Sequence, residues 1–108
     1  MTHPAQHPRP DIVMFQRAEL EAILRVYGRM VAAGEWRDYA IDGLKDRAEF
    51  SIFRHAAETP IYRVVKTPAD ARRQGAYKVV SATGLIVKRG HELSQVMRVF
   101  DRQLMRLT

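Results

Sequence analysis

The sequence contains no cysteine and no long hydrophobic run, and each absence excludes a class of protein. Without cysteine the chain forms no disulfide, thiolate metal site or thiol nucleophile, so a reducing cytoplasm is its expected location. A helix that crosses a bilayer needs about 20 apolar residues, and no segment approaches that length. The start of the chain also lacks the apolar core of a secretory signal. We therefore expect one small domain, built from 108 residues, with no membrane partner.

Recognisable catalytic motifs are absent as well. There is no glycine-rich phosphate loop and no Gly-x-Ser-x-Gly elbow, and His91-Glu92 lacks the second histidine of the zinc-binding helix motif. General acid–base catalysis would need a set of acids and a base that converge in a cleft. The candidates are Asp38, Asp42, Glu49, His55 and Glu58. Their spacing does not force convergence, so a carboxylate-dependent enzyme is kept only as an alternative, and no cofactor is predicted.

The segment from Asp38 to Glu49 has acidic residues at a spacing similar to that of a calcium-binding loop. Loop positions 1, 5, 6, 9 and 12 are occupied by Asp38, Asp42, Gly43, Asp46 and Glu49. However, Ala40 offers no side-chain oxygen at the third position, and Lys45 stands where an apolar residue is usual. The residues after Asp46 alternate like a strand instead of starting a helix. The segment is therefore predicted to be a solvated acidic turn, and no metal site is predicted.

The spacing of apolar residues predicts a single α+β domain over residues 15–108, after a disordered tail of residues 1–14 that contains proline and histidine. A helix over residues 17–33 has an apolar stripe of Leu20, Ile23, Leu24, Tyr27 and Val31. A second helix over residues 91–107 has a stripe of Leu93, Val96, Met97, Phe100, Leu104 and Leu107. About five strands lie between them, over residues 36–42, 47–56, 61–67, 76–81 and 85–89. Because their links are short, they predict an antiparallel meander with both helices packed on one face.

Charge is unevenly distributed along the chain, whose net charge is +6. Residues 1–59 carry 8 Lys and Arg against 9 Asp and Glu, whereas residues 60–108 carry 10 against 3. The positive excess therefore lies entirely in the later strands and the last helix. Such a field favours anionic partners and is weakened by salt.

Alternation within the strands predicts which side chains lie on the face away from the helices. We expect the helices to cover the face that bears Phe50, Ile52, Tyr77, Val79, Leu85 and Val87, and to leave Phe53, Lys78, Ile86 and Lys88 on the open face. Arg63 joins them if its strand has the matching phase. Basic side chains next to an aromatic ring on an open sheet are typical of single-stranded nucleic-acid binding. Lys88 and Arg89 also precede the second helix, whose dipole favours a phosphate. The predicted nucleic-acid or anion-binding residues are Phe53, Arg63, Lys78, Lys88 and Arg89, with Arg98 and Arg102 from a row on the outer side of the last helix.

Two other kinds of partner compete for this surface. An acidic protein would use the same cations. A second copy of the chain would instead pair open faces and bury apolar side chains, the candidates being Phe53 and Ile86 with Ile61, Val65 or Trp36. Salt distinguishes these partners, because phosphate-driven binding weakens steeply with ionic strength and apolar self-association does not. The best interpretation is a small, basic, non-catalytic binding module for nucleic acid or an acidic partner, with a homo-oligomeric scaffold as the alternative.

One segment and one short motif resemble a known family. They are YGRMVAAGEWRDYAID, from Tyr27 to Asp42, and the later Val87-Lys88-Arg89-Gly90. Both are similar to domain-of-unknown-function family 2794, a family of small uncharacterised bacterial proteins, and the likeness covers about Phe15 to the end of the chain. Gln16 departs from the small polar residue expected before the first helix, which affects only helix capping. The resemblance implies a compact cytoplasmic domain and supplies no catalytic residues, because the family has no assigned activity.

Overall fold

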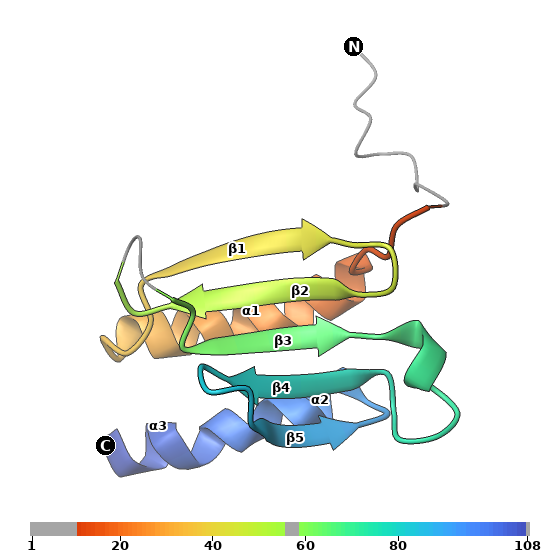
Figure 1. Cartoon of the computed structure of the whole chain (residues 1–108). Coiled ribbons are helices and arrows are strands. Elements are labelled where there is room, and N and C mark those ends of the chain that lie inside the picture. The colour runs from red at the N-terminus through yellow and green to blue at the C-terminus, as the bar shows by residue number, and fades with distance from the viewer. Residues whose placement is uncertain (1–10, 56–58, 108) are drawn as a thin grey trace.

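The computed structural model describes residues 11–55 and 59–107, and it confirms the predicted α+β meander. Within these residues, five antiparallel strands pair in chain order to form one sheet (Figure 1). In the sequence, one helical segment precedes the strands and another follows them. The strands are β1 (Asp38–Gly43), β2 (Ala48–Phe53), β3 (Tyr62–Lys66), β4 (Tyr77–Ser81) and β5 (Ile86–Gly90). The helices are α1 (Arg17–Ala32), α2 (Leu93–Met97) and α3 (Asp101–Leu107), with 3-10 turns η2 (Pro68–Asp70) and η3 (Arg98–Phe100). Residues 1–10 of the predicted tail lie outside the described residues.

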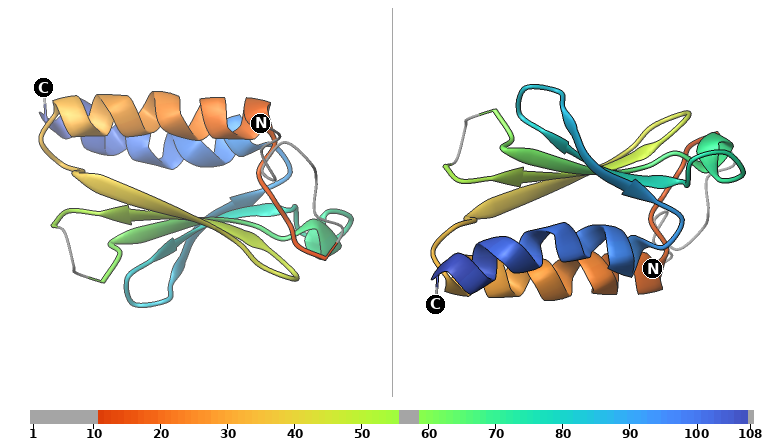
Figure 2. Two further views of the ribbon diagram at one scale, coloured as in Figure 1. Left: turned by 90° about the horizontal axis from the view of Figure 1, so that it is seen from above. Right: turned by 90° about the horizontal axis from the view of Figure 1, so that it is seen from below.

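The helices form a layer on one face of the sheet, as the sequence predicts. Figure 2 shows α1 and the α2–α3 segment side by side on this face, with the twisted sheet beneath them. In the described chain no helix or strand covers the opposite face of the sheet. This uncovered surface is called the open face below, and the other is called the helix face.

The core lies between the two layers. Ala48, Phe50 and Ile52 of β2 are fully buried, which confirms the predicted two-residue alternation. Trp36 precedes β1 and is 3% exposed, and its ring lies 4.8 Å from that of Phe100 in an edge-to-face contact. Aromatic pairs of this geometry stabilise a core beyond the area that they bury. The contact therefore fixes the C-terminal helical segment against the start of the sheet.

The buried side of α1 differs from the predicted stripe. Its buried residues are Ile23, Val26 and Met30, whereas Leu24 and Val31 are 38% and 40% exposed. The prediction that Leu24 and Val31 belong to the core is therefore wrong. Because α1 contacts α2 as well as the sheet, the buried side is centred between these two neighbours. Gly34 follows the end of the helix in a left-handed conformation, at a φ of 78°, as glycine commonly does there.

The second helix begins later than predicted and is not continuous. It starts at Leu93, and the 3-10 turn η3 separates α2 from α3. Leu93, Val96, Met97 and Phe100 are buried as the apolar spacing predicts. A 3-10 turn has three residues per turn instead of 3.6, so it changes the angular relation of the side chains on either side of it. This change affects Arg98 and Arg102, as described below.

The segment before α1 is attached to the sheet by hydrogen bonds. The N–H of Val13 donates to the carbonyl of Leu44 at 2.7 Å, and the Lys66 ammonium donates to the carbonyl of Met14 at 2.9 Å. Val13 also packs against the core. Val13 and Met14, which the sequence pattern assigns to the tail, therefore contact the domain.

The two edge hairpins differ in how well the sequence predicts them. Gly43 is the last residue of β1, and the first hairpin turns at Leu44 to Arg47, where the Leu44 N–H donates to the Arg47 carbonyl at 2.8 Å. Asp-Gly is a frequent turn dipeptide, but here Gly43 still belongs to β1, and the chain reverses only after it. In the second hairpin Gly84 has a positive φ, at 88°, a conformation that glycine adopts without strain and that its place between two strand patterns indicates.

Candidate nucleic-acid interface

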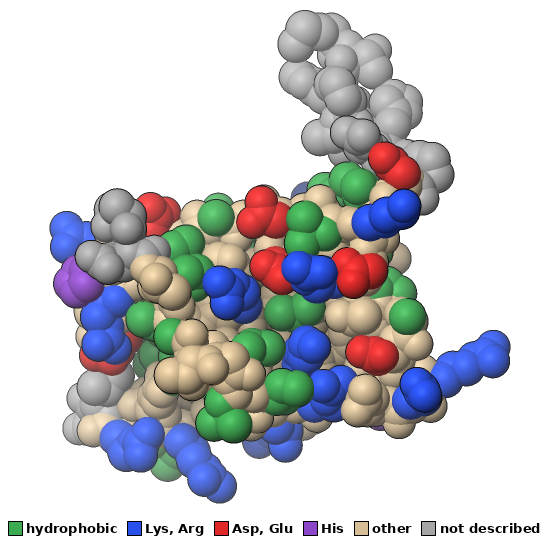
Figure 3. Space-filling model, in the orientation of Figure 1, with side chains coloured by type: hydrophobic (Ala, Val, Ile, Leu, Met, Phe, Trp, Pro, Cys, Tyr) green, Lys and Arg blue, Asp and Glu red, His purple; other side chains and the backbone are tan. Residues whose placement is uncertain are grey.

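The open face carries basic and apolar side chains contributed by four neighbouring strands. The register pairs Ser51 with Arg63, Arg63 with Val80, and Val65 with Lys78, and directly paired residues lie on the same face of a sheet. Arg89 pairs with Lys78, so it joins them there. Figure 3 shows this face, where blue, red and green side chains intermingle over the strands. The predicted placement of Phe53, Arg63 and Lys78 on the open face is confirmed.

A hollow of about 380 Å³ lies at the middle of the open face. It is lined by Arg47, Glu49, Arg63, Val65, Lys78 and Val80. The two valines provide an apolar floor, and three of the remaining four side chains are cations. We call these six residues the sheet hollow.

Glu49 is the acid of the sheet hollow, and it pairs with two of the three cations. Its carboxylate accepts a hydrogen bond from Arg47 Nε at 2.7 Å and lies 3.8 Å from Arg63 Nε. The hydrogen bond from Arg47 to Glu49 also raises the pKa of that arginine above its ordinary value. Within the described part of the chain, no acid forms an ion pair with Lys78. Lys78 is therefore the cation of the hollow that is available to a ligand, and Arg63 is only loosely held.

Arg89 lies beside the sheet hollow, but it already has an acidic neighbour. Its guanidinium lies 3.8 Å from the carboxylate of Asp70 in η2, and both side chains are about three-quarters buried. Asp70 in turn accepts three backbone hydrogen bonds at its carbonyl, from Arg73, Gln74 and Gly75. Arg89 therefore stabilises this loop and contributes less free charge than its position suggests.

Lys88 does not lie on the open face, and the prediction that places it there is wrong. The β4–β5 ladder contains a bulge: Val79 pairs with Lys88, but Val80 pairs with Ile86, so Val87 has no partner. Val79 is fully buried on the helix face, and Lys88 therefore projects to that side as well. A bulge inserts one residue into a strand and reverses the facing of those that follow, relative to simple alternation.

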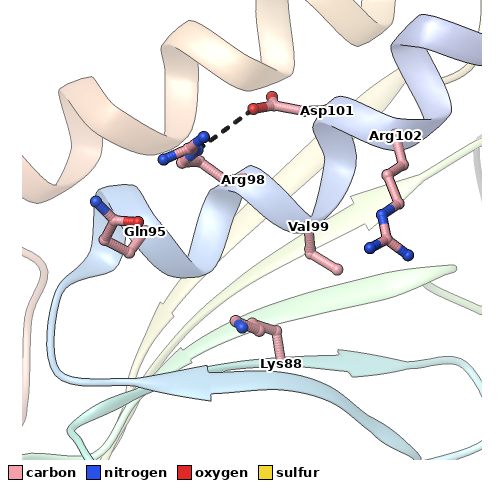
Figure 4. Close-up of a pocket in the computed structure, with 6 residues that line it drawn as sticks. All are labelled: Lys88, Gln95, Arg98, Val99, Asp101 and Arg102. Atoms are coloured by element: carbon pink, nitrogen blue, oxygen red, sulfur yellow. Dashed lines mark ion pairs between the residues drawn. The ribbon is translucent and has the colours of Figure 1, made fainter.

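Lys88 instead lines a cleft between β5 and the C-terminal helical segment. This cleft has a volume of about 540 Å³ and is lined by Lys88, Gln95, Arg98, Val99, Asp101 and Arg102. Figure 4 shows Lys88 and Arg102 extending into the space from opposite sides, whereas Arg98 turns away towards α1. Arg98 and Arg102 consequently do not form the predicted uniform row on the outer side of the helix. We call these six residues the β5 cleft.

The acid of the β5 cleft is engaged by arginines at its rim. The Asp101 carboxylate lies 3.7 Å from Arg98 Nε and 3.9 Å from a terminal nitrogen of Arg29 in α1. Lys88 and Arg102 have no ion pair with any acid among residues 11–55 and 59–107. The cleft therefore has two cations available to an anionic ligand.

The structure divides the predicted site residues between these two surfaces. Arg63, Lys78, Arg89 and Phe53 share the open face, and Lys88, Arg98 and Arg102 share the β5 cleft. Sequence reasoning misses Arg47 and Glu49 as members of the sheet hollow. The alternation of the second strand contains that signal, because Arg47 and Glu49 share the phase of Phe53.

The apolar area of the open face is smaller than predicted. Trp36 and Val65 are each 3% exposed, and Ile61 packs against the core, so these three offer little area to a second copy of the chain. Ile86 remains exposed at the β5 end. Little of the apolar area predicted for a second copy of the chain is therefore exposed on the open face.

The acid–base candidates do not form a separate cluster. Asp42 and Glu49 are cross-strand neighbours, but Glu49 is engaged by two arginines, and Asp38 lies at the other end of β1. Glu58 lies outside the described residues. No group of three or more His, Asp or Glu residues that could hold a metal ion occurs in the described chain.

Comparison with known proteins identifies a family and nothing more. A family model described as "Protein of unknown function (DUF2794)" matches residues 13–97. No curated protein and no solved structure matches the chain. None of the helices of the described chain combines the length and the apolar character needed to cross a membrane.

Proposed function

Since the chain belongs to the DUF2794 family, whose function is unknown, its role has to be inferred from its own surfaces, and we propose that it is a non-catalytic module that binds single-stranded nucleic acid on the open face. The observation that carries this proposal is the sheet hollow, where Arg63 and Lys78 surround an apolar floor on an uncovered sheet. Cysteine is absent from the sequence, which fits a cytoplasmic location where nucleic acid is present.

The chemistry of the hollow matches that of a nucleotide chain. Cations contact phosphates, and apolar or aromatic side chains contact the faces of bases. Lys78 and Arg63 supply the charge, while Val80, Ile86 and Phe53 supply apolar contacts on the same face. A flexible single strand can follow the twisted sheet, whereas the major groove of a DNA duplex is read by an inserted helix or two-stranded ribbon.

Reversing the two least constrained cations of the open face tests this proposal. We expect Arg63→Glu with Lys78→Glu to weaken binding of a fluorescent single-stranded oligonucleotide by roughly a hundredfold at low salt, because each reversal replaces a phosphate contact by repulsion. Fluorescence anisotropy at roughly 50 mM and 200 mM salt provides the affinity and its salt dependence.

A matched control reverses two cations on the solvent side of α1. Arg17→Glu with Arg25→Glu changes the net charge by the same amount, and both side chains are exposed and away from the sheet. The control variant should keep an affinity within about threefold of wild type. If both double variants lost the same affinity for the oligonucleotide, the loss would result from the change in net charge and not from a site on the open face. If the wild-type protein did not bind the oligonucleotide at low salt, the proposal would be wrong.

A further inference from the structure

The strand β5 is an edge of the sheet and lies directly beside the β5 cleft. It ends the strand order β1-β2-β3-β4-β5, and no strand of the described chain pairs with its outer side. An edge strand presents backbone N–H and C=O groups that another extended chain can pair with. On the helix side of this edge, the cleft separates β5 from the C-terminal helical segment (Figure 4).

The walls of the cleft favour an anionic occupant with apolar portions. Lys88 projects from β5 and Arg102 from α3, and both extend into the cleft without an acidic partner in the described residues. Val99 lies between them and supplies an apolar contact, and Gln95 offers an amide that both donates and accepts. None of the six residues that line the cleft is aromatic, so it has no ring on which a base would stack.

The first two residues of β5, together with Leu85 just before the strand, are also apolar although they are exposed. Leu85, Ile86 and Val87 are 66%, 42% and 39% exposed. Alternate side chains of a chain added to this edge would lie on opposite faces, one set over the cleft and the other beside Ile86 on the open face. Backbone pairing, positive charge and exposed aliphatic groups thus occur together along one strand.

We propose that β5 and its cleft bind an acidic, extended peptide segment of a partner protein, which adds to the sheet as a further strand. Acidic side chains of the peptide lie over the cleft and contact Lys88 and Arg102, and its apolar side chains lie on the opposite side and contact Ile86 on the open face. A peptide matches the outward backbone groups of the edge, which a nucleic acid does not. The bulge at Val87 interrupts regular pairing, which a free peptide accommodates more easily than the edge of a second folded sheet. This proposal is independent of nucleic-acid binding on the open face.

The test uses a labelled peptide of about eight residues that alternates glutamate with valine, a length that covers an average strand. A second peptide has the same glutamates but proline in place of each valine, so it keeps the charge and lacks half of the backbone donors. Anisotropy titrations of both peptides are carried out with wild-type protein. We expect the proline peptide to bind at least about tenfold more weakly than the alternating peptide.

Two double variants of equal charge change locate the site. Lys88→Glu with Arg102→Glu is expected to weaken the alternating peptide by at least about tenfold, whereas Arg63→Glu with Lys78→Glu, on the open face, should leave it within about threefold of wild type. Thermal melts confirm that both variants fold, which is expected because Lys88 and Arg102 are exposed.

Several results would overturn the proposal. Equal affinity for the two peptides would show attraction by charge alone, without strand addition. Loss of peptide binding in the variant Arg63→Glu with Lys78→Glu would place the peptide on the open face instead of the cleft. If Lys88→Glu with Arg102→Glu weakened the binding of an oligonucleotide more than that of the peptide, the ligand of the cleft would be a nucleic acid. A second copy of the chain would be the occupant if the light-scattering mass of the wild-type protein rose with its concentration and the variant Lys88→Glu with Arg102→Glu showed no such rise.

Discussion

Replacing Gly75 by alanine is expected to lower the free energy of unfolding by about 3 kcal/mol or more, which places it among the most destabilising single substitutions. Gly75 is buried and has a φ of 94°, a conformation that alanine rarely adopts. A Cβ atom there would overlap the carbonyl of Gly90 and would lie 2.7 Å from the backbone nitrogen of His91. These are backbone atoms at the end of β5, so they cannot rotate away as a flexible side chain would.

Gly84→Ala is the matched control, because it separates backbone strain from steric overlap. Gly84 also has a positive φ, at 88°, but a Cβ atom there meets nothing within 4 Å. This variant is expected to lose only about 1 kcal/mol. Urea titration followed by the fluorescence of the buried Trp36 measures both. Equal losses at Gly75 and Gly84 would show that the close approach to Gly90 is not the cause.

Glu19→Ala is expected to be the second large effect, at about 3 kcal/mol, because it leaves a buried ammonium without its counter-ion. The side chains of Glu19 and Lys66 are 11% and 13% exposed, and Lys66 Nζ lies 2.9 Å from Glu19 Oε1. The hydroxyl of Tyr77 donates to the other carboxylate oxygen, and the N–H of Gln16 donates to Oε1. One carboxylate therefore connects the start of α1 to β3 and β4. Urea titration at neutral pH measures the loss.

Acid should reproduce part of the same loss in the wild-type protein. Burial acts to raise the pKa of Glu19, but the hydrogen bonds from Tyr77, Gln16 and Lys66 outweigh it, so the folded-state pKa lies below the ordinary value of 4.5. A carboxylate with a lowered pKa stabilises the fold above its unfolded pKa, and the contribution disappears as the pH falls below 4.5 through the folded value. Burial and the hydrogen bond to Glu19 raise the pKa of Tyr77 to about 12, so a second loss is expected as the pH rises from 10 towards that value.

Glu21→Ala is the control variant for the urea titration at neutral pH and for the dependence of stability on acid pH. Glu21 lies on the same helix, but it is largely exposed and forms only a 3.8 Å pair with Arg17. Exposed pairs of this kind contribute less than about 1 kcal/mol. Glu19→Ala should also flatten the stability profile below pH 4.5, whereas Glu21→Ala should not. If the stability of Glu19→Ala fell below pH 4.5 as steeply as that of the wild-type protein, Glu19 would not be the source of that fall.

The sequence predicts the fold well where the signal is local. The alternation of Ala48, Phe50 and Ile52 identifies the buried face of β2, and the short links identify the meander. Gly34 and Gly84 have the positive φ angles that their positions predict. The buried side of α1 is not predicted, because it depends on where α2 packs, and α2 is more than 50 residues away in the chain.

The candidate site is predicted only in part, and a bulge in β5 accounts for the different placement of Lys88. Simple alternation places Lys78 and Lys88 together, but the unpaired Val87 moves Lys88 to the helix face. The residue types of β5 do not indicate a bulge, because the position of a bulge depends on how β4 and β5 pair. The same holds for Glu49, whose pairing with Arg63 follows from the β2–β3 register and not from spacing along the chain.

The division into two basic surfaces also changes which substitutions are informative. A variant that combines Lys78→Glu with Lys88→Glu would affect the open face and the β5 cleft together, so its result could not be assigned to either. The pairs Arg63 with Lys78, and Lys88 with Arg102, each lie on one surface. Their comparison separates a nucleic-acid ligand from an acidic peptide.

NMR chemical-shift mapping of the wild-type protein shows whether the open face binds single-stranded nucleic acid. A short single-stranded oligonucleotide is added at low salt, and the backbone amide shifts are followed. We expect the largest shifts at Arg63, Val65, Lys78 and Val80, around the sheet hollow, and no shifts in α1. Largest shifts at Gln95 and Arg102 in the β5 cleft, or no shifts at all, would contradict the proposal.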